Sequence, residues 1–236
     1  MILAIDSSSL VASVALVDEN TVIAEYTINL KKTHSQTLLP MIDEIFKMTG
    51  IDKKSLSAIA VAQGPGSFTG LRIGAATAKG LALALDIPIV GVSTIEMMAY
   101  NFNHCNKLIC PIMDARRNQV YTGIYECAED ALKQVEKDAA LSIEELIDKI
   151  RSIGKEVIFI GDGIPVFQEL IDKELEVKHC YAKQHLNRQQ SSALAVLGLK
   201  KLAEGKAVVS DNFAPVYMRM SQAERERLEN GKENES

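Results

Sequence analysis

The sequence predicts an α/β fold built from two related lobes, and two observations support this prediction. The outline of β-hairpin, helix, strand and glycine turn occurs twice along the chain, first between residues 2 and 66 and again between residues 108 and 163. In both copies the opening apolar strand ends in an aspartate, Asp6 or Asp114. Repetition of a whole supersecondary outline indicates an internal duplication, here of a lobe made of a β-sheet with helices.

The lobe boundary is expected in the polar segment 101–106. We therefore predict a first lobe over residues 1–103 and a second over 104–220, whose last helix packs back on the first lobe. Residues 221–236 are rich in charge and have little to bury, which is typical of a flexible tail.

Bulk composition narrows the classes of function. The chain has 236 residues, 47% of them hydrophobic, and a formal net charge of −5, so the molecule as a whole offers no basic surface for nucleic acid. The cysteines form no CxxC pair and read as free thiols of a reducing compartment or as core residues. With no leader-like N-terminus and no apolar run near the ~20 residues of a membrane span, we expect a cytoplasmic protein without a membrane partner.

The first lobe should open with strands at residues 2–5, 13–17 and 22–30, the last with the alternating apolar pattern of a half-buried strand. A helix is predicted over 35–49, with Gly50 as its C-cap. Its apolar residues follow the spacing of one helical face; they include Leu38, Ile42, Ile45 and Phe46.

A glycine-rich loop, residues 64–74, joins a predicted strand at 58–62 to a predicted helix at 69–85. The backbone N–H groups of such a strand–turn–helix arrangement can bind an anion. The spacing excludes two standard nucleotide loops. A Walker A loop has Lys and then Ser or Thr after its last glycine, whereas Gly70 is followed by Leu71 and Arg72. A Rossmann fingerprint has glycine at its sixth position, which Thr69 occupies in this chain.

Small residues form two ridges on this helix. Gly70, Gly74, Ala78 and Ala82 form the first, and Ala76, Gly80 and Ala84 form the second. An interior helical glycine costs about 1 kcal/mol relative to alanine, so close approach of another backbone must compensate. The ridges pack either on this chain's own sheet, which is the more common case, or on a helix of a partner. Arg72 opposes the helix dipole in the first turn and should face a carboxylate or an anion, on this chain or another.

Further elements follow in order. A strand is expected at 87–92, and Ser93 to Glu96 reads as a capping box. The second lobe should contain strands at 108–113, 119–126 and 157–160, a capping box from Ser142 to Glu145, a short helix at 166–171, and a helix capped by Ser191 or Ser192 that ends at Gly205.

Charged residues at the strand ends leave alternatives open. Arg116 and Arg117 suit a phosphate or a partner's carboxylate, but an internal pair with Asp114 or Glu126 explains them equally well. Asp6 can bind backbone N–H groups of its own turn. The four histidines, His34, His104, His179 and His185, contain no i, i+4 pair, so we infer no metal site.

Six motifs together resemble the bacterial TsaB (YeaZ) family over about residues 1–220. They are Ile2-Leu3-Ala4-Ile5-Asp6-Ser7-Ser8, His34-Ser35-Gln36-Thr37-Leu38-Leu39-Pro40, the loop 64–74 with Lys79-Gly80-Leu81-Ala82, Gly91-Val92-Ser93-Thr94-Ile95-Glu96, Asp114-Ala115-Arg116-Arg117 and Pro215-Val216-Tyr217-Met218-Arg219.

The resemblance implies a two-lobed actin-like/Hsp70-like ATPase (ASKHA) fold. It also implies a non-catalytic subunit, required for making threonylcarbamoyladenosine next to the anticodon of tRNA, that binds and activates the catalytic paralogue TsaD. A TsaE-type ATPase would join the complex, tRNA would be met only through the complex, and the chain alone would form a homodimer.

Candidate site residues follow from both lines of reasoning. The expected helical partner interface consists of Leu38, Ile42, Ile45, Phe46, Gly70, Arg72, Gly74, Ala78 and Ala82. The candidate anion or nucleotide contacts are Asp6, Gly64, Gly66, Ser67, Asp114 and Arg116. No catalytic residue, metal or resident cofactor is expected, although ATP or ADP could bind at the partner interface.

The first turn, Ser7 to Ser9, lacks the glycine that the phosphate-binding turns of actin-like ATPases usually carry. This puts nucleotide binding in doubt and argues against the alternative function, a stand-alone ATP-dependent phosphotransferase of the same superfamily. A peptidase is disfavoured because no Ser/His/Asp or HExxH arrangement is visible.

Overall fold

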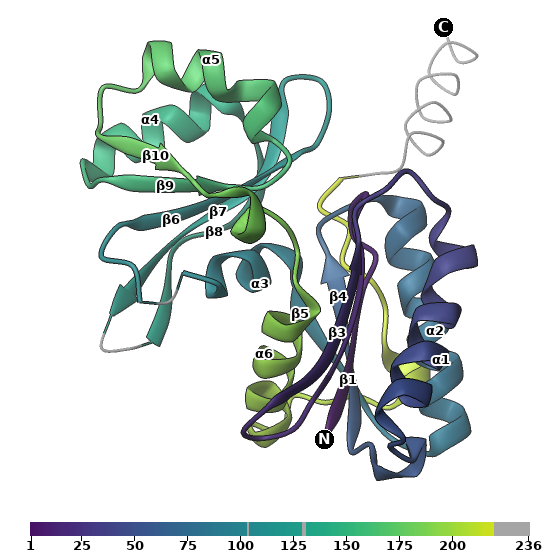
Figure 1. Ribbon diagram of the computed structural model, residues 1–236. Helices are drawn as coiled ribbons and strands as arrows, with labels where there is room; N and C mark the ends of the chain where they lie inside the picture. Colours follow the sequence, from purple (N-terminus) through teal and green to yellow (C-terminus); the bar gives the residue numbers. More distant parts are fainter. Residues whose placement is uncertain (103, 129–130, 220–236) are drawn as a thin grey trace, which may run out of the picture.

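The computed structural model describes residues 1–102, 104–128 and 131–219, so the predicted tail lies outside the described residues. Two lobes are visible in Figure 1. The first contains β1 (Ile2–Asp6), β2 (Ala12–Val17), β3 (Val22–Ile28), α1 (His34–Thr49), η1 (Lys53–Ser55), β4 (Ala58–Gly64), α2 (Phe68–Leu85), β5 (Ile89–Ser93) and α3 (Thr94–Tyr100). The elements that follow are β6 (Leu108–Asp114), β7 (Gln119–Ala128), β8 (Ala131–Ser142), α4 (Ile143–Ile153), β9 (Val157–Ile160), α5 (Ile164–Glu174), β10 (His179–Tyr181), η2 (Gln184–Leu186), α6 (Ser191–Ala203) and η3 (Ser210–Asn212).

The two five-stranded sheets have the same topology. The first has the order β3-β2-β1-β4-β5, and the second, read in the same sense, has the order β8-β7-β6-β9-β10. In each sheet the first three strands of the lobe pair antiparallel and the next two pair parallel. This confirms the predicted α/β fold with a duplicated lobe, the arrangement of the actin-like/Hsp70-like ATPases.

Helices cover both faces of the first sheet. The apolar faces of α1 and α2 pack on one face, where Leu38 and Ile45 are fully buried among strand residues. The other face is covered by α6, which contacts β1, β2, β4 and β5 although it follows the second sheet in the sequence. Since helices cover both faces of this sheet, β1 and β2 are buried at every position, and their sequences are mostly apolar on both faces.

Helix ends largely follow the predicted signals. Gly50 adopts the left-handed conformation at the end of α1, and the capping box from Ser142 to Glu145 forms at the start of α4. Two details differ. The side chain of Glu96 does not close a box with Ser93 but pairs with Lys201 at 2.6 Å. The last long helix takes Gln190 as its N-cap, because the Ser192 hydroxyl donates to Glu25 instead.

A strap, residues 206–219, ties the chain's end to both lobes. Val208 forms a β-bridge with Ile89 at the edge of the first sheet, and the N–H of Val216 donates to the carbonyl of Gln63 at 2.7 Å. The Arg219 guanidinium then donates to the carbonyl of Ala115 in the second lobe. None of the helices within the described ranges has the length and apolar character of a membrane span.

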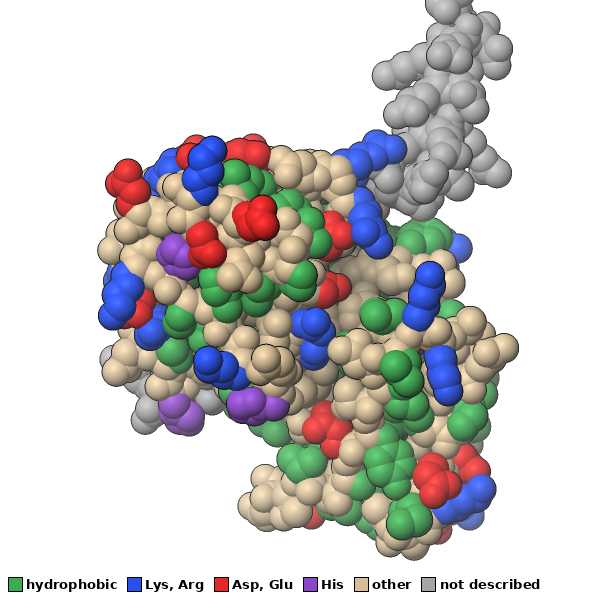
Figure 2. All heavy atoms as spheres, turned by 45° about the horizontal axis from the view of Figure 1, so that its top comes forward, with side chains coloured by type: hydrophobic (Ala, Val, Ile, Leu, Met, Phe, Trp, Pro, Cys, Tyr) green, Lys and Arg blue, Asp and Glu red, His purple; other side chains and the backbone are tan. Residues whose placement is uncertain are grey.

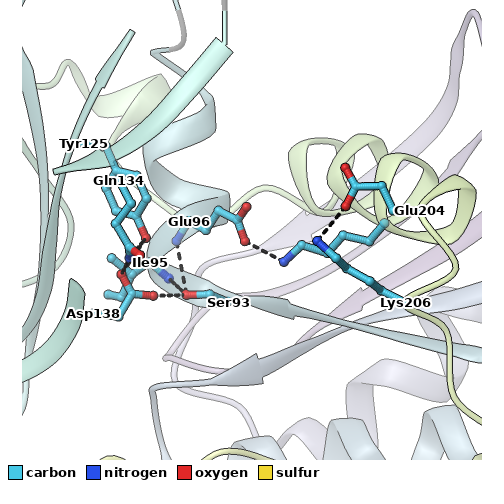
Figure 3. Close-up of polar contacts among 9 residues, drawn as sticks. Ser93, Ile95, Glu96, Tyr125, Gln134, Asp138, Glu204 and Lys206 are labelled. Carbon is cyan, nitrogen blue, oxygen red and sulfur yellow. Dashed lines mark hydrogen bonds and ion pairs between the residues drawn. The ribbon is translucent and has the colours of Figure 1, made fainter. Parts of the chain in front are cut away.

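A partly buried carboxylate joins the lobes where β5 meets α3 (Figure 3). Asp138 on β8 accepts hydrogen bonds from Ser93 Oγ at 2.5 Å, from the Tyr125 hydroxyl at 2.5 Å and from Gln134 at 2.9 Å. Ser93 Oγ also accepts the N–H groups of Ile95 and Glu96 and so caps α3. Burial raises the pKa of Asp138, and burial together with this carboxylate raises the pKa of Tyr125. One side chain therefore fixes the connecting helix against the second sheet.

We predict that Asp138→Ala lowers the free energy of unfolding by about 2 kcal/mol, because two hydroxyl donors lose their acceptor. Urea unfolding followed by circular dichroism measures this change. Asp148→Ala on the exposed face of α4 is the matched control and should leave the midpoint nearly unchanged. Equal midpoints for both variants would show that the junction does not depend on Asp138.

Candidate functional site

A cleft of about 490 Å³ lies between the lobes. Its walls are the first turn at Ser8 and Ser9, the loop at Gly66 and Ser67, and the second-lobe residues Asp114, Arg116 and Asp162. Figure 2 shows the hollow between the two masses of the molecule, with acidic side chains inside it. Four of the six candidate anion contacts, Gly66, Ser67, Asp114 and Arg116, line this cleft, whereas Asp6 and Gly64 do not.

Asp6 lies behind the cleft wall and is fully buried. Its Oδ1 accepts the N–H of Ser8 at 2.9 Å, and within the described part of the chain its Oδ2 has no hydrogen-bond partner. Burial raises the pKa of this carboxyl to about 6, against the opposing effect of the bond from Ser8. Asp6 thus accepts a hydrogen bond from the backbone of its own turn, as the sequence allowed.

The glycine loop packs directly on this turn. A Cβ at Gly66 would lie 2.2 Å from the carbonyl oxygen of Ser8, and one at Gly70 would lie 2.0 Å from that of Ser7. Two hydrogen bonds hold the contact, from Ser67 N to Ser8 O at 2.7 Å and from Ser7 Oγ to Gly70 O at 2.9 Å. Because real Cβ atoms do not approach so closely, glycine is required at both positions.

Gly64 allows the strap to pack closely on the end of β4. Its φ is +115°, and a Cβ there would lie 2.5 Å from the carbonyl oxygen of Val216. The residue is thus explained by backbone packing, and the prediction that it contacts a ligand is corrected.

The second wall of the cleft is acidic. Arg116 pairs with Asp114 at 3.0 Å, which is the internal pair named as an alternative. The N–H of Asp114 donates to Asp162 Oδ1 at 3.2 Å, and burial raises the pKa of Asp162. Two carboxylates stand against one guanidinium on this wall, so the wall offers no net positive charge to attract the phosphates of a nucleotide.

Most of the expected partner interface lies inside this chain's own core. Leu38, Ile42, Ile45, Phe46, Gly70, Gly74, Ala78 and Ala82 are all buried. A Cβ at Gly74 would lie 2.5 Å from Ser7 Oγ, so the first ridge packs on the chain's own sheet. This corrects the assignment of these eight residues to a partner, and substituting them would disturb the fold itself. Arg72 is exposed, with its guanidinium 4.1 Å from the centre of the Phe68 ring.

The second ridge faces solvent instead. Ala76, Gly80 and Ala84 are exposed, Leu83 beside them is 72% exposed, and no atom lies within 4 Å of a Cβ built at Gly80. On α1, Leu39 and Met48 are also exposed, at 55% and 70%. The sequence pattern revealed both ridges, but the spacing alone did not tell which one faced the sheet.

Other groups have structural partners. His34 Nε2 lies 2.7 Å from the carbonyl oxygen of Ser9 and steadies the first turn, while His179 pairs with Asp172 at 3.0 Å. Within residues 1–102, 104–128 and 131–219, no group of three or more His, Cys, Asp or Glu side chains could hold a metal ion.

The raised pKa of Asp6 predicts how the stability of the fold changes with pH. The folded chain binds this proton with a pKa of about 6, against an ordinary value of 3.8, so this group makes stability fall as pH rises from about 4 to 6. The loss amounts to about 3 kcal/mol. Asp6→Asn, neutral at every pH, should remove this part of the pH dependence in urea unfolding between pH 4 and 7. Parallel pH profiles for the two proteins would contradict the assignment.

Comparison with known proteins agrees with the motifs. Residues 21–227 match the family model "TsaD: tRNA N6-adenosine threonylcarbamoyltransferase". The chain is 38% identical to the tRNA threonylcarbamoyladenosine biosynthesis protein TsaB of Bacillus subtilis, over 98% of this chain and 99% of the relative. It is 32% identical to the protein of that name from Escherichia coli, over 92% of this chain and 94% of the relative.

A solved structure agrees as well. YeaZ from Pseudomonas aeruginosa superposes with a TM-score of 0.79 at 26% identity, covering 92% of this chain and 98% of that one. The chain therefore belongs to the TsaB (YeaZ) family.

Proposed function

We propose that this chain is a non-catalytic subunit required for threonylcarbamoyl transfer to the adenosine next to the anticodon of tRNA, and that it acts by binding and activating a TsaD-type subunit. The observation that carries the proposal is the outer stripe of α2, which consists of Arg72, Ala76, Gly80, Leu83 and Ala84 and is exposed along its length. The names of the family's members supply the pathway.

Gly80 is the residue of this stripe that most specifically indicates a helix partner. A glycine inside a helix costs about 1 kcal/mol relative to alanine, yet among the described residues no atom beyond the helix's own neighbouring backbone lies within 4 Å of the position that a Cβ would take. The missing side chain lets a second helix approach closely, and the exposed Leu83 and Leu39 can fill the groove between the helices. The interface thus uses the two helices named from the sequence, but through their outer faces.

The partner is a TsaD-type paralogue. The match of residues 21–227 to the TsaD family model supports a related lobe in that subunit, which would present the equivalent helices to α1 and α2. In its absence, the same stripe would pair two copies of this chain, since an exposed apolar stripe tends to find a mate. A TsaE-type ATPase would complete the assembly in the cytoplasm, and tRNA would be bound only in the complex.

Catalysis is assigned to the partner because this chain's cleft is poorly suited to nucleotide. Its first turn is packed against the glycine loop, and its far wall carries Asp114 and Asp162. ATP or ADP would bind at the interface with the partner, where other residues complete the site.

We predict negligible ATP hydrolysis by the isolated chain, measured as phosphate release by highly purified protein. Threonylcarbamoyl transfer should appear only when the chain is mixed with the TsaD-type subunit and the other components. Steady turnover that disappears in Asp6→Asn or Asp114→Asn would instead favour the stand-alone phosphotransferase.

The interface prediction uses Gly80→Arg, a change for which this chain has open space. The variant should fold like the parent, as thermal melting will show, but it should lose co-elution with the TsaD-type subunit and at least tenfold in tRNA modification. Gln168→Arg, at an exposed position of α5 in the second lobe, is the matched control and should retain both. Co-elution of Gly80→Arg at parental strength would rule out the outer stripe as the contact.

A further inference from the structure

The turn between β6 and β7, residues 115–118, concentrates positive charge on a molecule whose net charge is −5. The Arg116 side chain is 86% exposed, and its carboxylate partner is Asp114. Arg117 is exposed, and the described residues provide no carboxylate to pair with it. A guanidinium without a partner gains most from an anion that arrives from outside the chain.

The backbone of this turn is held in an uncommon conformation. Arg116, Arg117 and Asn118 have φ values of +63°, +57° and +58°, which is the left-handed region that non-glycine residues seldom occupy. The structure fixes the turn on several sides, through the N–H of Ala115 to Gln119 at 2.9 Å and the Asn118 amide to Glu144 at 2.8 Å. Strain that is so fully supported is typical of a functional segment.

The turn also contains backbone donors for which the described residues supply no acceptor. Within the described part of the chain the N–H groups of Arg117 and Asn118 have no acceptor. Successive free amides beside two guanidinium groups are the combination that binds phosphate oxygens. The turn can therefore offer fixed donors as well as charge.

Arg219 of the strap forms hydrogen bonds with the backbone of this turn. Its guanidinium donates to the carbonyl oxygens of Ala115 and Arg116, the latter at 3.4 Å. It adds a third positive charge and, because the strap is anchored to Gln63 in the first lobe, it holds the turn over the mouth of the cleft. Two residues earlier, Tyr217 is 40% exposed; its ring centre lies 4.8 Å from that of Phe68, and its hydroxyl accepts a hydrogen bond from Arg72 at 3.2 Å.

The first-lobe side of the cleft has basic residues close by in the sequence. His34 lines the cleft, and Lys31 and Lys32, three and two residues before it, are exposed. The described residues give neither lysine an ion-pair partner. Figure 2 shows Lys and Arg side chains on both sides of the hollow between the lobes.

We propose that these two rims bind the phosphate backbone of the tRNA while the partner subunit holds that tRNA. The inference rests on the proposed function. Phosphate explains the guanidinium groups, the free amides and the separation of charge across the cleft mouth, because a nucleic-acid strand carries a charge at every nucleotide. The net charge of −5 keeps the chain alone from binding RNA strongly, so the contact acts only in the complex.

The test compares Arg117→Glu and Lys31→Glu with Lys54→Glu. The control lies in η1, before β4, at the end of the first sheet away from the cleft, and it makes the same lysine-to-glutamate change. The assembled complex is titrated with tRNA at several salt concentrations. Each rim variant should weaken binding about three- to tenfold near 0.1 M salt and reduce the slope of log affinity against log salt by about 1. Arg117→Lys should restore most of the affinity, and Lys54→Glu should match the parent.

Three outcomes would overturn the inference. If every variant complex assembles and binds tRNA with the parental affinity and salt slope, the rims do not contact RNA, and the proposed function stands. If the rim variants fail to co-elute with the TsaD-type subunit, the charges bind that protein instead. If the parent chain itself fails to enter the complex, the proposed function fails, and this inference fails with it.

Discussion

The structure depends on one close approach, that of the glycine loop and the start of α2 to the turn after β1. Gly66, Gly70 and Gly74 lie against Ser7 and Ser8 at distances that no side chain could tolerate. This contact sets the position of α2 on the first sheet and buries Asp6 behind the turn. Because the inner ridge of α2 is held in this way, the outer stripe of the helix is exposed among the described residues.

This contact determines which surfaces of α2 are buried and which are exposed. The inner ridge of α2 belongs to the core and the outer stripe is exposed, while the cleft between the lobes carries Asp114 and Asp162 on its second-lobe wall. The strap and the Asp138 junction connect the lobes at separate points, one through Arg219 and one through Ser93. Both connections restrain the position of one lobe relative to the other.

Sequence reasoning reached the fold and most of its elements, because hydrophobic periodicity, caps and the repeated outline are local signals. It assigned the partner surface to faces of α1 and α2 that the structure shows to be buried in this chain's own core. Gly74 and Gly80 look alike in sequence, and only the contacts show that Ser7 faces the first and open space faces the second. The Asp138 junction could not be foreseen either, since Ser93 and Asp138 are 45 residues apart and meet only through the packing of two lobes.

The central claim is that this chain works through the outer faces of α1 and α2. Hydrogen–deuterium exchange, comparing the chain alone with the chain bound to the TsaD-type subunit, tests it most directly, because backbone amides report burial residue by residue. The account predicts new protection along α1 and the outer turns of α2, around Gly80, with little change in α4 and α5. Protection confined to the second lobe, with α1 and α2 exchanging as in the free chain, would contradict it.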